Sequence, residues 1–185
     1  MNNLVYGSLG DIAGRSGKTL AETFLSVDAL VLVDVSMSMD INDCPGSRRR
    51  YEVACEQLVR LQREIPGKVG VISWSISAYF CPGGLPKAPF GSTNLAGALD
   101  FVRPADGCGI RMIVISDGEP DDAKRALDLA RTFQTKIDTI YCGPEMGSGR
   151  EFLAKLSALT GGQAVDQSVN DLSNLSKTVK GLLAA

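Results

Sequence analysis

Oxygen-bearing side chains stand out first in this sequence, because Asp34, Ser36 and Ser38 follow directly on an unbroken apolar run. Such a run predicts a buried strand, which would place the three side chains at the end of that strand. Two more candidates lie downstream: Thr93, in a loop before a helical pattern, and Asp117, after a second apolar run. Carboxylate and hydroxyl oxygens are hard ligands, and a set gathered from three loops suits Mg²⁺. The sequence therefore predicts a metal site made of these five residues.

The pattern D-x-S-x-S, followed by a Thr and then by an Asp, resembles the metal ion-dependent adhesion site of the von Willebrand factor A domain family. The resemblance implies metal-binding roles for all five residues, with Mn²⁺ or Ca²⁺ as alternatives to Mg²⁺. The three hydroxyls would bind the ion directly or nearly so, and the two carboxylates directly or through water. Because neutral hydroxyls donate little charge, the ion would keep an affinity for one more anionic oxygen, which a Glu or Asp of a partner protein could supply.

The chain departs from the family pattern at two points. Met37 stands between the two serines, where many family members have Gly. Together with Met39 it predicts a soft apolar rim around the metal that contacts the partner. Some integrin subunits have a second metal site that needs a pair of acids where this chain has Ile41 and Asn42, so we expect no second metal there.

Apolar runs alternate with helical patterns along the chain, which is typical of an open parallel sheet with helices on both faces. The sequence thus predicts an α/β, Rossmann-like doubly wound domain with a mostly parallel sheet of about six strands and one short antiparallel edge strand. The expected strands are 29–34, 69–74, 78–81 (the edge strand), 110–116, 136–142 and 163–165. The expected helices are 48–64, one beginning near 94, one beginning near 121, 150–159 and 170–183. In such folds the ligand crevice lies where the strand order reverses, and we expect Asp34 and Asp117 to face each other there.

Helical spacing also predicts which side chains are buried. In the helix at 48–64 these are Tyr51, Cys55, Leu58 and Leu61, and in the last helix they are Leu172, Leu175, Val179 and Leu182. Residues 1–27 are expected to be an N-terminal extension packed on or flanking the domain at 28–185, with a helix near 20–26. Within the extension, the segment from Gly14 to Thr19 ends like a phosphate-binding P-loop, but Ile12 replaces the Gly that the full pattern needs, so we do not expect nucleotide binding.

Composition excludes several classes of function. The 185 residues contain no His, which rules out Ser-His-Asp and Cys-His catalysis within the chain. A net charge of −2 with dispersed signs argues against nucleic acid and anionic membranes as partners. We also expect the three consecutive arginines at 48–50 to form a solvated face, or to help select an acidic partner, and Asp40, Asp43 and Glu119 to be solvated acids.

Cellular location is expected to be cytoplasmic. No apolar run approaches the length of a membrane span, and the N-terminus lacks the pattern of a signal peptide. The five cysteines are odd in number and include no C-x-x-C pair, which is typical of reduced thiols. Cys55 and Cys142 are expected to be small buried hydrophobic residues.

Two functions of different classes follow. The favoured one is a non-enzymatic, Mg²⁺-dependent protein-interaction module, an intracellular adaptor or regulatory subunit. Intracellular family members often act with AAA+ ATPases or in multiprotein assemblies, so the resemblance implies a partner of that kind. The alternative is a metal-dependent phosphohydrolase using the same Asp-bound Mg²⁺. Its haloacid-dehalogenase-like version needs a second Asp two residues after Asp34, where this chain has Ser36.

Overall fold

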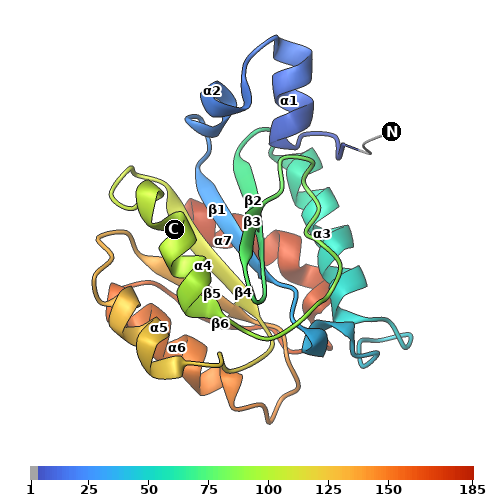
Figure 1. The fold of residues 1–185 in the computed structure, drawn as a ribbon. Helices are drawn as coiled ribbons and strands as arrows, with labels where there is room; N and C mark the ends of the chain where they lie inside the picture. Colours follow the sequence, from blue (N-terminus) through green and yellow to red (C-terminus); the bar gives the residue numbers. More distant parts are fainter. Residues whose placement is uncertain (1–3) are drawn as a thin grey trace.

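A six-stranded sheet forms the centre of the structure, a computed structural model that describes residues 4–185 (Figure 1). The strands are β1 (Ala29–Asp34), β2 (Val69–Trp74), β3 (Ala78–Phe80), β4 (Arg111–Ser116), β5 (Ile137–Tyr141) and β6 (Ala164–Asp166). Their order is β3-β2-β1-β4-β5-β6, and every neighbouring pair is parallel except β2 and β3. The predicted fold class is therefore confirmed, including the antiparallel edge strand.

Helices cover both faces of the sheet (Figure 1). On one face lie α3 (Arg50–Glu64) and α7 (Leu175–Ala184), and on the other lie α4 (Leu95–Val102), α5 (Ala123–Ala130) and α6 (Gly149–Thr160). Short 3₁₀ helices occur at η1 (Met37–Asp40), η2 (Arg103–Ala105) and η3 (Leu172–Asn174). Because successive strand residues point to opposite faces, Leu30 and Leu32 pack under α4 to α6, whereas Val31 and Val33 pack under α3 and α7. Burial on both faces explains why β1 is an unbroken apolar run.

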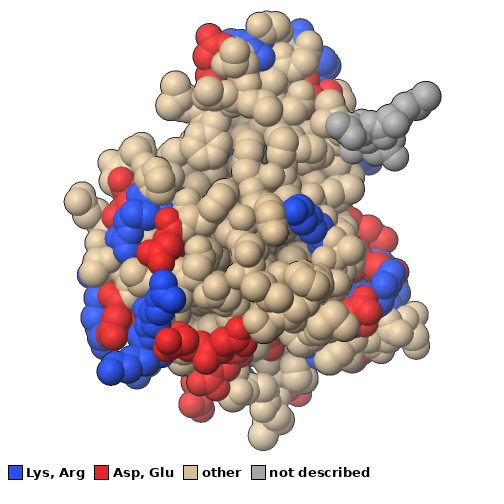
Figure 2. Space-filling view, in the orientation of Figure 1, with Lys and Arg blue, Asp and Glu red and all other residues tan. Residues whose placement is uncertain are grey.

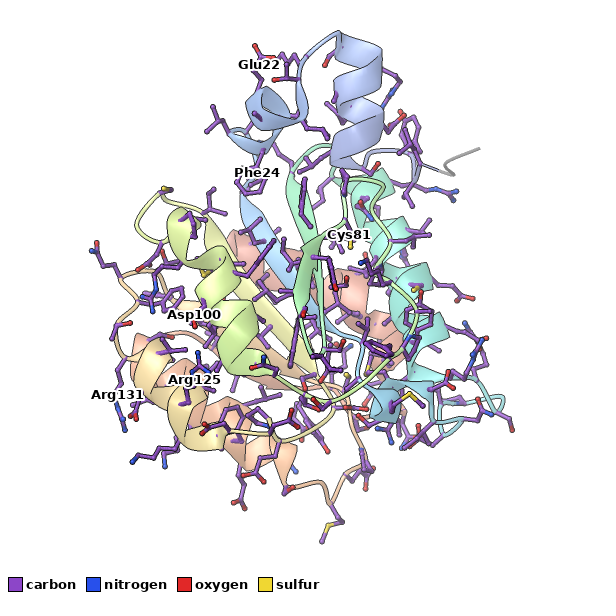
Figure 3. The ribbon with its side chains drawn as sticks, in the orientation of Figure 1. Glu22, Phe24, Cys81, Asp100, Arg125 and Arg131 are labelled. Atoms are coloured by element: carbon purple, nitrogen blue, oxygen red, sulfur yellow. The ribbon has the colours of Figure 1, made fainter. Side chains whose placement is uncertain are left out.

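On the face covered by α4, α5 and α6, neighbouring helices also contact each other at the surface. Arg125 of α5 lies beside Asp100 of α4 (Figure 3), with 3.2 Å between its guanidinium nitrogen and the carboxylate. Both side chains are largely exposed, so this ion pair contributes at most about 1 kcal/mol. Packing of α4 and α5 on the sheet therefore holds the layer in place.

The N-terminal segment packs against the amino end of the sheet through α1 (Leu9–Ser16) and α2 (Leu20–Phe24). Leu9 is buried in the core, and the ring of Phe24 meets that of Phe80 edge to face with 5.7 Å between centroids (Figure 3). The P-loop-like segment joins the two helices: Gly17 ends α1 with a positive φ, and Thr19 caps α2. A P-loop would instead join a strand to a helix.

Most of the buried positions predicted from helical spacing are found in the structure. Leu58 and Leu61 are fully buried, as are all four apolar residues of the last helical segment, which the structure divides into η3 and α7. Cys142 is also fully buried. The prediction was wrong for Tyr51 and Cys55, which are only partly buried, because the inner face of α3 is turned toward residues 50, 53 and 54. No helix among residues 4–185 is long and apolar enough to cross a membrane.

Candidate functional site

The candidate site lies at the carboxyl ends of β1 and β4, which are neighbours in the sheet. Asp34 is the last residue of β1, and Asp117 directly follows β4. The chain continues from β1 to β2 on one side and from β4 to β5 on the other, so the strand order reverses between β1 and β4. Ligand crevices of open α/β sheets form at such a point. Helix and strand packing thus places residues more than 80 positions apart, such as Asp34 and Ser116, within hydrogen-bonding distance.

Asp34 is fully buried and its two carboxylate oxygens both accept hydrogen bonds. The backbone N–H of Ser36 donates to one oxygen at 2.7 Å, and the Ser116 hydroxyl donates to the other at 2.6 Å. Burial, and to a smaller extent the nearby charge of Asp117, raises the pKa of Asp34 to about 7, although these hydrogen bonds act in the opposite direction. The metal-free site therefore holds a carboxyl that changes its charge near neutral pH.

A series of hydrogen bonds connects the two serines of the D-x-S-x-S pattern to Asp117. The Ser36 and Ser38 hydroxyl oxygens are 3.0 Å apart, and the Ser38 hydroxyl donates to Asp117 Oδ1 at 2.7 Å. The other oxygen of Asp117 accepts from Arg50. Four of the five predicted ligands are thus brought together, directly or through Ser116.

Thr93 is held next to this group by its backbone. Its N–H donates to a carboxylate oxygen of Asp121 at 3.2 Å, and its C=O accepts from the Asp121 N–H at 3.0 Å. The same loop is bonded to the segment after β1, where the Met37 N–H donates to the Gly91 C=O. Within residues 4–185, no hydrogen bond links the Thr93 side chain to the other four predicted ligands, so its loop rather than its hydroxyl places it here.

The donor set fits Mg²⁺ and fits Zn²⁺ poorly. It consists of two carboxylates and three hydroxyls, all hard oxygen donors, in a protein without His. Across the described residues, no three Asp, Glu, Cys or His side chains gather in a way that could hold a metal, so an ion at this site depends on the hydroxyls. A hydroxyl can offer a lone pair to a cation while donating its proton to a carboxylate. The serine hydrogen bonds described above are therefore compatible with metal binding.

Three contributors to the site were missed from the sequence: Ser116, Arg50 and Asp43. Ser116 supports Asp34, and Arg50, expected on a solvated face, has a side chain only 5% exposed and pairs with both Asp117 and Asp43. A sequence signal for Arg50 existed, because the positions three, four and eight residues later are all buried in the core of α3. This spacing places Arg50 on the inner face of the helix.

The structure places the two methionines of the predicted rim differently. Met37 is 58% exposed beside the site, whereas Met39 is fully buried in the core, with its sulfur 3.9 Å from that of Cys142. Met39 does not reach the rim, because the 3₁₀ turn of η1 directs its side chain into the core while Met37 stays exposed. Phe90 and Ile76 are also exposed, and both lie next to Gly91, whose C=O accepts a hydrogen bond from the Met37 N–H.

Replacement of Gly149 by Ala is expected to disturb the site from a distance. A Cβ on this residue, the first of α6, would lie 2.7 Å from the Cα of Gly118, which directly follows Asp117. Because the clash is with backbone, the loop must shift, and we expect a loss of about 1–3 kcal/mol in the free energy of unfolding, measured by urea denaturation. Weaker metal binding should accompany the loss.

The matched control is Gly181→Ala in the exposed part of α7, where a Cβ meets nothing within 4 Å. This variant should gain about 0.5–1 kcal/mol, because Ala is the better helix former. Equal effects of the two substitutions would contradict the proposed packing of α6 on the Asp117 loop.

Comparison with known proteins gives structural likenesses only. No protein-family model and no curated protein matches this sequence. Among solved structures, a mutant of the PilB minor pilin from Streptococcus sanguinis superposes with a TM-score of 0.63 at 12% identity, covering 86% of this chain and 61% of the pilin chain. A von Willebrand factor type A structure from Catenulispora acidiphila superposes with a TM-score of 0.60 at 16% identity, covering 86% of this chain and 42% of that one.

A third structure, manganese-loaded TRAP protein from Plasmodium vivax, has a TM-score of 0.55 at 15% identity, covering 85% of this chain and 73% of TRAP. This chain therefore has the fold of a von Willebrand factor A domain and spans less than two thirds of the pilin and the Catenulispora chains. At these identities the likeness concerns the fold alone.

Proposed function

We propose that this chain is a Mg²⁺-dependent protein-interaction module without catalytic activity of its own. The observation that carries the proposal is the hydrogen-bonded series from Ser36 through Ser38 to Asp117, beside Asp34, at the point where the strand order reverses. These residues and Thr93 would hold the ion. When bound, the metal would supply a strong attraction for an anionic oxygen. The chain's own residues would hold the ion so that a free coordination position faces solvent. The manganese in the TRAP structure supports a metal role for this fold.

The partner that fits this surface is a protein with a Glu or Asp next to an apolar side chain. Its carboxylate would complete the coordination of the ion, and its apolar neighbour would pack on Met37 and Phe90. The loop after β4 adds exposed acids at Glu119, Asp121 and Asp122, and Figure 2 shows acidic side chains gathered at this lower end of the molecule. An acidic partner would be repelled there without a metal, so the ion should control binding.

Adaptor or regulatory activity inside the cell is part of the proposal. The five cysteines are free, which suits a reducing compartment. We include a partner of the AAA+ ATPase class, or a multiprotein assembly, in the proposal because intracellular members of the family that the sequence resembles often act with such proteins. The phosphohydrolase alternative is less well supported, because both oxygens of Asp34 accept hydrogen bonds from within the chain and Ser36 stands where a second Asp is needed.

Metal-dependent capture tests the proposal. Immobilised wild type, Thr93→Ala and a control would each be incubated with soluble extract of the source organism, with Mg²⁺ or with EDTA. The control is Thr178→Ala, a partly exposed residue of α7 whose hydroxyl donates only to the Asn174 C=O. We expect a partner that is held by wild type and Thr178→Ala, only with Mg²⁺, and is lost with Thr93→Ala. Titration with Mn²⁺ should show binding weakened about tenfold or more in Thr93→Ala alone. Equal capture under all conditions would place the function on another surface.

A further inference from the structure

Arg50 is buried against the proposed metal site. Its side chain is 5% exposed, and one terminal nitrogen donates to Asp117 Oδ2 at 2.5 Å. The remaining side of the guanidinium donates to both oxygens of Asp43, with 2.8 Å from Nε to Oδ1. Since the other oxygen of Asp117 accepts from Ser38, Arg50 and a cation bound at the serines would share one carboxylate.

Helix formation does not explain this placement. Arg50 is the first residue of the 15-residue helix α3, where the helix dipole is positive and a cation is disfavoured. Burial of a guanidinium adds a desolvation cost, which only close pairing with carboxylates offsets. Pairing with Asp117 and Asp43, rather than stabilisation of α3, therefore explains why Arg50 is buried here.

Arg50 changes the net charge of the buried groups at the site. Asp34 and Asp117 are fully buried, whereas the side chain of Asp43 is 31% exposed, so that water screens its charge more strongly. With both buried carboxylates ionised and Arg50 beside them, a divalent ion would leave one uncompensated positive charge. Without Arg50, the same ion would leave the buried group neutral.

We propose that Arg50 is a permanent counter-cation of the metal site. This inference rests on the proposed function, because it assumes that a divalent ion binds there. In the metal-free protein Arg50 compensates the buried charge of Asp117 and keeps the fold independent of metal. It also lowers the affinity of the site for a divalent ion alone. The positive charge that is left after metal binding favours an anionic oxygen, so the partner's carboxylate and the metal bind cooperatively.

Metal titration of three variants of the full chain tests this role. Mn²⁺ binding would be followed by electron paramagnetic resonance, and Mg²⁺ binding by competition. Arg50→Gln removes the charge but keeps an N–H donor for Asp117, and should bind Mn²⁺ about tenfold or more tightly than wild type. Arg50→Lys keeps the charge and should stay within about threefold of wild type. Asp43→Asn removes an acid that shares Arg50, and should weaken binding by about twofold to fivefold.

The outcomes distinguish an electrostatic role of Arg50 from a role in positioning Asp117. If Arg50 only positioned Asp117, Arg50→Gln would bind metal no more tightly than wild type, and this result would overturn the inference. Circular dichroism would check the fold. If Arg50→Gln does not fold, Asp43→Asn becomes the test. Mn²⁺ binding by Asp43→Asn that is unchanged or tighter than in wild type would contradict the proposed role of Arg50. Absence of Mn²⁺ binding by wild type would instead overturn the proposed function itself.

Discussion

Asp117→Ala should lower the free energy of unfolding of the metal-free protein by about 3–5 kcal/mol, the range found when one partner of a buried ion pair is removed. The side chain of Asp117 is fully buried, and its loss leaves Arg50 with a single, partly exposed acid and Ser38 without its acceptor. Urea denaturation in EDTA measures the change without any contribution from metal.

Two further variants identify the cause of this loss. Asp43→Ala should cost about 1–2 kcal/mol, because its side chain is partly exposed and water can replace part of the interaction. The double variant Arg50→Met/Asp117→Ala removes both buried charges, and it should recover part of the stability lost in Asp117→Ala. A loss below about 1 kcal/mol in Asp117→Ala, or a double variant less stable than the single one, would show that the ion pair does not contribute as described.

Affinity for Mg²⁺ should rise about a hundredfold between pH 5 and pH 7 and then level off, because a single proton must leave Asp34 before it can act as a ligand. Burial raises the pKa of this carboxyl to about 7, from an ordinary value of 3.8. Below its pKa Asp34 is protonated in the metal-free protein, so metal binding releases a proton, and the apparent affinity changes about tenfold per pH unit. Titrations with Mn²⁺ at several pH values between 5 and 8 measure the slope.

The stability of the metal-free protein should have the opposite dependence on pH. Because the pKa of Asp34 is higher in the folded than in the unfolded state, its contribution to stability is complete below about pH 3.8 and is lost as the pH rises through about 7. Thr93→Ala keeps Asp34 and should keep the pH slope of metal binding at lower affinity. An affinity that is flat between pH 5 and pH 7 would mean that Asp34 is already ionised without metal.

Local patterns were sufficient to predict the architecture. The apolar run before Asp34 predicted a buried strand, and the short segment after Trp74 was correctly predicted as an antiparallel edge strand. The stripe of apolar residues near the C-terminus correctly predicted a helix packed on the sheet. These features depend on periodicity within one segment, which the sequence contains in full.

Errors arose where a side chain's surroundings come from another segment. Met39 has the same residue type as Met37 and lies two positions away, yet η1 turns it into the core. Arg50 was read with its two neighbours as part of a charged surface, although helical spacing already places it on the inner face of α3. Spacing alone could not identify its partner, because Asp117 lies 67 positions away.

The sequence by itself determined the fold class, the strand that ends at Asp34, the strand that ends just before Asp117, and the residue types available to a metal. Only the tertiary structure decided how those residues are connected. It showed that Ser116 supports Asp34, that Thr93 is placed by its backbone, and that Arg50 adds a positive charge to the site. The physical reason is that strand and helix formation depend on nearby residues, whereas the electrostatics of a buried site depend on groups that meet only when the chain has folded.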